Sequence, residues 1–537
     1  MPRILSFSTE AREHLLEGAR QLSEAVSSTL GPKGSNVAIG RQWGPPVVIH
    51  DGVGVAREID LVDPYENMGA QLLKEAASKT NDAAGDGTTT ATALGYAIAS
   101  EAHKNVVAGA NAMMLRRGIE HATEVMLKEL TVLSVPISKP EEVLQVATIS
   151  AQNEEIGEIV ADGIARMGKD GVLAVEESGT TQTYLEIKEG MEFSKGWISP
   201  YFVTNSDLGE CVLEKPYILV TDLKMTSVTD VTAFLRKFVE EPTENMNILI
   251  IAEEVAGDAL ALMAINKAKG SLNVCAVQAP GFGDKRKDML KDIAVVTGAT
   301  YFSTDLGVRL NDEGFSVADL GRAARVTCTE KATIIVDGGG DKKKIALRLT
   351  ELKNALEKAE TDFDGEKIRE RIARLTTGVG IVYVGASSET EMRERKERFI
   401  DAISAAKVAM EEGIVPGGET ALIRAALAID PSTEEGDARI GMNVVKHAAS
   451  QPFRKLMRNA GEDDGRMLAN LEAVLPKKNW GIDVIDGKAK DLVKAGIIDP
   501  VKVTKQALQN ASSVAVMILT TDTLVVDAPK KEPVVQD

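Results

Sequence analysis

A short run of glycines, an aspartate and threonines, GDGTTT at residues 85–90, is the strongest sign of chemistry in this chain. It lies between one stretch with helical spacing of apolar residues, ending near Ala84, and another that begins at about Thr88. The free N–H groups and the dipole of a helix N-terminus attract phosphate, and glycines let the backbone approach closely. Asp86 would then hold a Mg²⁺ that bridges phosphates. The alternative is a glycine turn before an N-capped helix, with no ligand.

Three further sequence features indicate a nucleotide site only when they are taken together with this run. They are a glycine loop, TLGPKG at 29–34, a glycine turn, VPGGE at 415–419, and Asp401 within the basic and apolar segment at 393–410. Alone, LGPKG is also a good helix stop. Neither GxxxxGK[ST] nor a strand-borne GxGxxG occurs, so a P-loop or a Rossmann site is not supported. A nucleotide site in this chain would have another design.

The elements that position these residues are mostly helical. Helical spacing of apolar residues predicts helices over 10–30, 65–84 and 88–107, and the pattern returns from about Glu397 to the end. Between the first two lies PPVVIHDGVGVAREI at 45–59, whose two β-rich runs around a glycine predict a hairpin.

The middle of the chain has a different pattern. From Lys215 to Ser303, short apolar runs alternate with amphipathic segments of helical length, which is typical of a β/α-layered domain inserted between helical flanks. The runs are YILVTD, NILIIAEE, NVCAVQAP and IAVVTGATYF. Residues 342–376 are highly charged and predict a solvated pair of helices.

Glycine and proline mark the places where the pattern changes. Gly190, Gly378, Gly413 and Pro136 are therefore candidate hinges, although both residue types also end ordinary elements.

Composition narrows the function classes. The 537 residues are 44% hydrophobic and 26% charged, which excludes a disordered or collagen-like chain. The net charge of −18 opposes binding to nucleic acid and to anionic membranes. Three cysteines, far apart in sequence and without a CxxC pair, predict neither a disulfide framework nor a zinc site. With no signal peptide and no apolar run of about 18 residues, a cytoplasmic location is expected.

Several segments together resemble the group I chaperonins, the GroEL family. The resemblance runs in one register from about Ser8 to Asp527. The segments that carry it are TLGPKG, DGVGVAREI, YENMGAQLLKEAASKTNDAAGDGTTTAT, GWISPYF, APGFGDKRKDML, EEGIVPGGETALIR and AGIIDPVKVTKQALQ.

The resemblance implies a multidomain α+β chaperonin fold. A mainly helical equatorial domain would comprise residues 1–135 and 413–537, and a small intermediate hinge domain residues 136–190 and 378–412. An inserted α/β apical domain would comprise residues 191–377. Such subunits form two stacked seven-membered rings, a tetradecamer, that bind non-native polypeptides at the ring mouth. They enclose them under a small heptameric co-chaperonin, with ATP, Mg²⁺ and K⁺ as cofactors.

The resemblance also assigns residues to a nucleotide site. Asp86 would bind Mg²⁺, while Asp401 would position the attacking water with the help of Asp51. Phosphoryl transfer needs positioning and charge neutralisation more than covalent chemistry, which carboxylates and backbone donors supply. The remaining contacts to ATP would come from Thr29, Leu30, Gly31, Pro32, His50, Gly87, Thr88, Thr89, Thr90, Gly418, Asp483, Val484, Ile485 and Asp499.

Capture of clients is assigned by the same resemblance to a loop and two helices. Apolar contact is non-directional, so a groove between the helices would hold apolar segments without reading their sequence. Each residue alone also fits a core position. The residues are Trp197, Tyr201, Phe202, Thr232, Leu235, Leu260, Ala264 and Ile265.

This sequence departs from the family in places. In the nucleotide pocket, His50 stands where a lysine is usual, and Asp483, Val484 and Ile485 replace the small residues that usually contact the adenine base. In the capture groove, Thr232 and Ala264 replace larger aliphatic residues. The tail lacks Gly-Gly-Met repeats. Two other functions stay open: a scaffold or holdase that does not hydrolyse ATP, and a small-molecule kinase. The presence of Asp51, Asp86 and Asp401 argues against the first, and the lack of a separate small-substrate site argues against the second.

Overall fold

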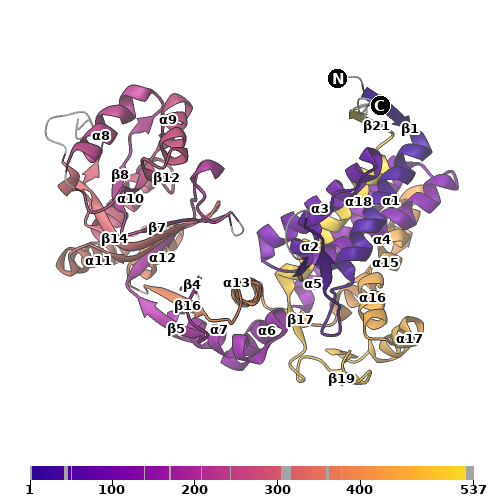
Figure 1. Cartoon of the computed structure of the whole chain (residues 1–537). Coiled ribbons are helices and arrows are strands. Elements are labelled where there is room, and N and C mark those ends of the chain that lie inside the picture. The colour runs from indigo at the N-terminus through magenta and orange to yellow at the C-terminus, as the bar shows by residue number, and fades with distance from the viewer. Residues whose placement is uncertain are drawn as a thin grey trace. The chain divides into compact units, whose positions relative to one another are not determined.

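Two compact units make up the chain (Figure 1). The computed structural model describes residues 3–41, 46–49, 51–137, 139–168, 171–206, 209–241, 243–303, 316–357, 362–376 and 378–527. The first unit combines residues 1–162 and 386–537, and the second is the continuous segment 163–385. The second unit is thus an insertion into the first, as the sequence predicts. The finer division into three domains stays a prediction.

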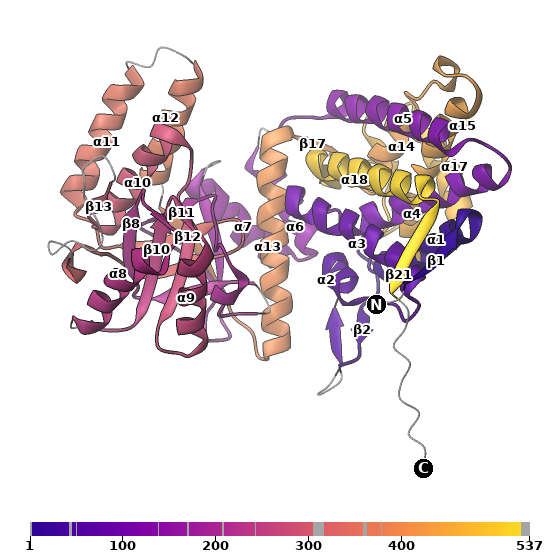
Figure 2. The ribbon, with the colours of Figure 1, turned by 90° about the horizontal axis from the view of Figure 1, so that it is seen from above.

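The first unit is a helical bundle in which the last long helix packs against helices from the start of the chain (Figure 2). Its core is rich in alanine, and the helices cross closely. A side chain at Gly18 would collide with the backbone of Glu66, and one at Gly69 with the backbone of Leu15. The bundle helices are α1 (Ser8–Ser27), α3 (Pro64–Ala84), α4 (Thr88–Val107), α5 (Ala112–Leu133), α15 (Gly436–Ala448) and α18 (Val501–Thr520).

Shorter elements complete the first unit. The two ends of the described chain pair with each other, since β1 (Arg3–Phe7) runs antiparallel to β21 (Thr523–Asp527). Three other antiparallel pairs are β2 (Val37–Ile39) with β3 (Val47–Ile49), β17 (Ile414–Pro416) with β20 (Ile498–Pro500), and β18 (Trp480–Ile482) with β19 (Ala489–Asp491). The other helices are α6 (Pro140–Ala151), α7 (Glu154–Met167, which continues into the second unit), α13 (Glu389–Glu412), α14 (Thr420–Ala426), α16 (Gln451–Asn459) and α17 (Asp464–Val474).

The predicted hairpin at residues 45–59 is wrong in its second half. The strand β3 is present, but the following run forms α2 (Gly52–Glu58). Asp51 caps this helix, because its carboxylate accepts hydrogen bonds from the amides of Val53 (3.2 Å) and Gly54 (2.6 Å). Val55 is fully buried in the core of the first unit. The cap and this burial outweigh the β-propensity of the valines.

The second unit contains the predicted β/α layers. Its main sheet has the order β12-β10-β8-β14-β15-β6, with β7 and β13 paired to β14 and β8. Helix α9 packs against β12, and α10 against β8. The segment IAVVT, predicted as part of a strand, is the end of α10. The elements are β6 (Gly190–Phe193), β7 (Cys211–Glu214), β8 (Tyr217–Thr221), α8 (Val228–Glu240), β10 (Asn247–Ala252), α9 (Gly257–Ala268), β12 (Asn273–Gln278), α10 (Gly283–Thr297), β13 (Tyr301–Phe302), β14 (Gly321–Cys328) and β15 (Thr333–Gly338), with the short pair β9 (Lys224–Met225) and β11 (Glu254–Val255).

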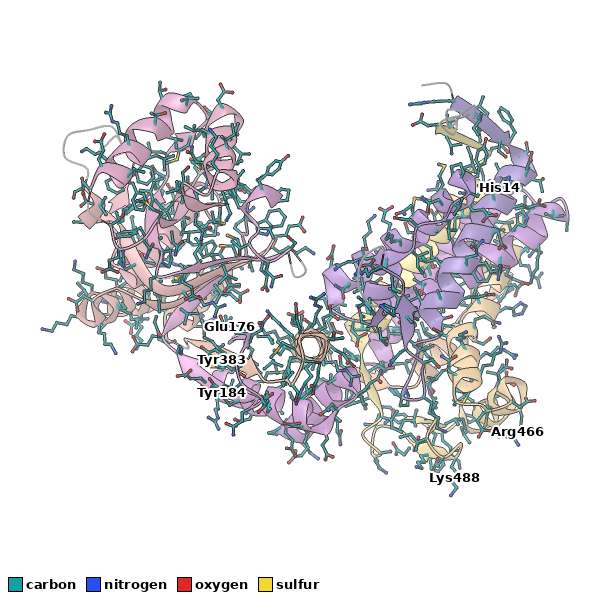
Figure 3. The ribbon with its side chains drawn as sticks, viewed as in Figure 1. His14, Glu176, Tyr184, Tyr383, Arg466 and Lys488 are labelled. Carbon is teal, nitrogen blue, oxygen red and sulfur yellow. The ribbon has the colours of Figure 1, made fainter. Side chains whose placement is uncertain are left out.

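A second, three-stranded sheet has the order β4-β16-β5. Tyr184 and Tyr383 stack side by side on it, with ring centroids 5.0 Å apart (Figure 3). The Lys188 ammonium donates a hydrogen bond to the Tyr383 hydroxyl (3.0 Å). The strands are β4 (Val172–Glu177), β5 (Tyr184–Lys188) and β16 (Val379–Val384).

The charged segment at 342–376 forms two helices, α11 (Lys342–Glu357) and α12 (Asp362–Thr376), as predicted. Ion pairs attach them to α10. Arg348 of α11 and Arg371 of α12 both donate hydrogen bonds to the buried Asp292, at 2.8 and 2.7 Å.

The three cysteines, distant in sequence, are brought into one core. Cys211, Cys275 and Cys328 are free and buried in the second unit, and Cys211 faces Cys328 in the register of β7 and β14. None of the helices in the described ranges is long and apolar enough to cross a membrane.

Candidate functional site

The loop between α3 and α4 is tightly enclosed. Gly85 and Gly87 both have left-handed backbones, with φ of 69° and 86°. A side chain at Gly85 would collide with Ser404 of α13, and one at Gly87 would lie 2.7 Å from Val503 of α18. Both positions therefore require glycine. Because the residue before α4 is Gly87, no side chain of the N-cap residue satisfies the first amides of this helix, which favours the ligand-binding interpretation over the capped helix.

The predicted acidic residues converge on this loop. Asp86 accepts hydrogen bonds from the Gly87 amide (2.6 Å) and the Ser150 hydroxyl (3.2 Å). Gly52, next to Asp51, lies so close to Thr88 and Thr89 that a side chain there would collide with the Thr89 hydroxyl. The start of α2 thus lies directly against the start of α4.

Helix α13 brings Asp401 to the same place. Asp401 is one turn before Ser404, the residue that touches Gly85. Burial raises the pKa of Asp401 well above its ordinary value, and the charges of Asp51 and Asp86 raise it further. Burial likewise raises the pKa of Asp86, although hydrogen bonds from Gly87 and Ser150 oppose the shift.

These carboxylates repel one another in a buried place, which a bound cation would relieve. Oxygen ligands of this kind suit Mg²⁺. Among the residues that the structure describes, no group of three or more His, Cys, Asp or Glu side chains is arranged to hold a metal by itself. The fit is therefore to a metal that takes most of its ligands from phosphate and water.

Glu397 is a further acidic residue of this cluster, which the sequence reasoning missed. It lies one helical turn before Asp401 on α13. Burial, and then the charge of Asp51, raises its pKa to about 7. The i, i+4 spacing from Asp401 is the signal that could have identified it.

The predicted TLGPKG loop follows α1, which ends at Ser27. Gly31 has φ of 83°, and a side chain there would collide with Leu456 of α16. The Asn459 side chain, also from α16, donates hydrogen bonds to the carbonyls of Ser27 (2.9 Å) and Leu30 (3.0 Å). Asn459 thus holds the loop at the end of α1, a role with no local sequence signal.

The glycine turn at 417–418 and Asp499 are neighbours because β17 pairs with β20, with Val415 opposite Asp499. A side chain at Gly417 would lie 3.1 Å from the Asp499 carboxylate. Burial raises the pKa of Asp499 to about 7, with the charge of Asp86 as the second cause. The Asp499 and Asp86 carboxyl groups therefore lie close enough for the charge of one to act on the other.

Residues 483–485 form the tip of the β18–β19 hairpin. The Asp483 carboxylate accepts hydrogen bonds from the Ile485 amide (2.8 Å) and the Lys490 ammonium (2.7 Å), so both of its oxygens stabilise the hairpin itself. Val484 is buried, whereas the Ile485 side chain is 68% exposed. Lys33 donates a hydrogen bond to the Ile485 carbonyl (3.2 Å), which links the hairpin to the TLGPKG loop.

Figure 3 shows Lys488 of this hairpin and Arg466 of α17 pointing outward from the same end of the first unit. The buried side of the hairpin, with Val484, is the side that contacts the core.

The structure thus brings the predicted pieces at 29–32, 51, 86–90, 401, 418 and 499 into the first unit. Thr29 is buried and donates its hydroxyl to the Val26 carbonyl (2.9 Å). His50 lies outside the described residues.

The predicted capture residues lie in the second unit and divide into two groups. Tyr201 is 75% exposed and Ile265 is 52% exposed, and Thr232 is also exposed. By contrast, Phe202 is fully buried and Leu235 nearly so. These two predictions are corrected, because both side chains belong to the core of the second unit. Trp197, Leu260 and Ala264 are half-buried.

Asp499 gives a prediction on stability. Its folded pKa of about 7 lies above the ordinary 3.8, so ionisation of this carboxyl destabilises the fold progressively as pH rises from about 4 to about 7. We expect Asp499→Asn to stabilise the protein by about 2 kcal/mol more at pH 8 than at pH 5. Urea unfolding at the two pH values measures this difference, and an equal effect at both would contradict the assignment.

Comparison with known proteins finds one family match and similar solved structures. The sequence pattern described as the TCP-1/cpn60 chaperonin family matches residues 22–529. Crystal form II of the chaperonin gp146 from the bacteriophage EL 2 (Pseudomonas aeruginosa), in presence of ATP-BeFx, has a TM-score of 0.73 at 21% identity. That match covers 98% of this chain and 100% of the phage chain. Crystal form I gives 0.63 at the same identity, covering 98% and 99%. At this identity the similarity shows a shared fold.

Proposed function

This chain belongs to the TCP-1/cpn60 chaperonin family, and from that premise we propose that it is an ATP-driven chaperonin that captures non-native proteins. The observation that carries the proposal is the enclosed glycine loop at the start of α4, with Asp86 and Asp401 beside it. A helix start with free amides and nearby carboxylates is the arrangement that binds a metal-bound phosphate.

The chain's own residues would act by binding and positioning. Bound Mg-ATP supplies the phosphoryl group and the metal charge. The amides at the start of α4 and the hydroxyls of Thr88, Thr89 and Thr90 would hold the phosphates, and Asp86 the metal. Asp401 would accept a hydrogen bond from the attacking water, with Asp51 beside it, which fixes the direction of attack.

Gly413, a candidate hinge, directly follows helix α13. It has φ of 88°, and a side chain there would collide with the Ser134 hydroxyl. Directly after it, the backbones of Val135 and Ile414 exchange two hydrogen bonds of 2.8 Å. A hinge here, together with Gly378 and Pro136, would let Asp401 approach or leave the phosphates, and hydrolysis would then be coupled to a change of shape.

The finer features of the proposal rest on the sequence resemblance to group I chaperonins. They are two stacked seven-membered rings, a small heptameric co-chaperonin as lid, K⁺ as a second cation and a cytoplasmic location. Steady-state ATPase assays combined with native mass measurement test the proposal. A slow turnover that depends on Mg²⁺ and K⁺ in a very large particle supports it. A large particle without turnover would favour the holdase, and phosphorylation of a small molecule would favour the kinase.

The capture surface can be tested at its exposed residues. We expect Tyr201→Glu and Ile265→Glu each to abolish most of the protection of an aggregating client, because a charge buried against an apolar client is costly. Basal ATP turnover should stay unchanged. Light scattering of a denatured client measures protection.

The matched control is Leu347→Glu, on α11 of the same unit, where the side chain is 63% exposed. This variant should protect as well as the wild type. Full protection by both Tyr201→Glu and Ile265→Glu would place the capture surface elsewhere.

A further inference from the structure

Glu419 has an unusual backbone for its residue type. It follows Gly418 at the start of α14, and its φ of 61° lies in the left-handed region, which a residue with a side chain adopts only under strain. Strain of this kind persists where the surroundings hold the residue in place, and it concentrates at functional sites.

The Glu419 side chain reaches the proposed phosphate loop. The Thr90 hydroxyl donates a hydrogen bond of 2.6 Å to the Glu419 carboxylate, across 329 positions of sequence. Burial raises the pKa of Glu419 to about 8, the bond from Thr90 lowers it, and the charges of Asp499 and Asp86 raise it. Glu419 therefore lies among the acidic groups of the nucleotide site.

This contact opposes the binding of a phosphate in two ways. A threonine hydroxyl has one proton to donate, so a hydroxyl that donates to Glu419 is not free to donate to a phosphate oxygen. When it is ionised, which its raised pKa of about 8 confines to mildly alkaline pH, the Glu419 carboxylate also repels the negative charge of the phosphates.

We propose that Glu419 sets the nucleotide affinity of this chaperonin by competing with a nucleotide phosphate for the Thr90 hydroxyl. The Thr90–Glu419 hydrogen bond must open before ATP is fully bound. This inference rests on the proposed function, because it takes Thr90 as a phosphate ligand.

Titration of the assembled protein with Mg-ATP provides the test. We expect Glu419→Gly to tighten the dissociation constant about tenfold, since it removes the acceptor and the charge together. Glu419→Gln keeps an acceptor but never carries the charge, so at pH 9, above the Glu419 pKa of about 8, it should tighten binding by about threefold. If the glycine variant does not assemble, Glu419→Ala, which also removes the acceptor, carries the test, and an unchanged dissociation constant then overturns the inference.

A double substitution separates competition from a general change of structure. In the wild type, Thr90→Ala should cost little affinity, because the hydroxyl is already engaged. In the Glu419→Gly background, Thr90→Ala should cost several-fold more. Equal costs in both backgrounds would overturn the inference.

Asn479→Gly is the control for strain, because Asn479 also has a left-handed backbone, with φ of 65°, in the same unit. It should raise thermal stability as Glu419→Gly does, yet leave nucleotide affinity unchanged. If the wild type itself binds no Mg-ATP, the proposed function fails. If the wild type binds and the Glu419 variants bind equally well, only this inference fails.

Discussion

Asp401→Ala should slow ATP hydrolysis by about 100-fold, the usual size of a lost water-positioning or proton-accepting group. The affinity for Mg-ATP should not fall. Asp401 is a buried carboxylate whose pKa is raised by burial and by Asp51 and Asp86, so its removal relieves repulsion in the site while depriving only the attacking water of its partner. Single-turnover hydrolysis and nucleotide titration separate the two effects.

Glu394 on the same helix α13 offers a matched control. Its side chain is exposed and forms an ion pair of 2.7 Å with Arg398, one turn away along the helix. Glu394→Ala should hydrolyse ATP at the wild-type rate. A wild-type rate in Asp401→Ala would refute the assignment of Asp401 to catalysis.

Asp86→Ala should weaken Mg-ATP binding by about 10- to 100-fold, as expected when a charged ligand group is lost from a buried site. The loss should depend on the metal. In calorimetric titration with ATP in the presence of a chelator, the variant should bind at least as tightly as the wild type, because without Mg²⁺ the Asp86 carboxylate contributes no attraction and, when ionised, repels the phosphates.

The exposed Asp82, one turn earlier on α3, provides the comparison. Asp82→Ala should bind Mg-ATP normally. If Asp86→Ala also binds Mg-ATP normally, Asp86 does not hold the metal.

Much of the fold could be predicted because the helical spacing of apolar residues is clear in long amphipathic helices. Helix α4 begins and ends at the predicted residues, and α3 begins one residue before its predicted start. The errors fall on short segments where local preference and tertiary contact disagree. The valines of α2 and of the end of α10 favour strands, but the cap from Asp51 and the burial of Ile293 and Val296 make both segments helical.

The candidate site was predictable where a motif is local, as at residues 85–90. Residues that act through the fold had no such signal. Glu419 meets Thr90, and Asn459 holds the end of α1, only because distant segments pack together. The buried Phe202 and Leu235 show the converse case: a family position does not specify whether a side chain faces the core or the surface.

The pairing of β1 with β21 has a consequence for how the protein is made. The first unit lacks a strand and its last long helix, α18, until the end of the described chain has been synthesised. The second unit is continuous, and its last residue, Gly385, leaves the ribosome earlier. Residues 386–527 take roughly 7 to 28 seconds to synthesise at roughly 5–20 residues per second. During that interval the apolar faces of α1, α3 and α4 that pack against α18 remain uncovered. A nascent subunit of this chaperonin is therefore itself an incompletely folded chain that is prone to aggregate.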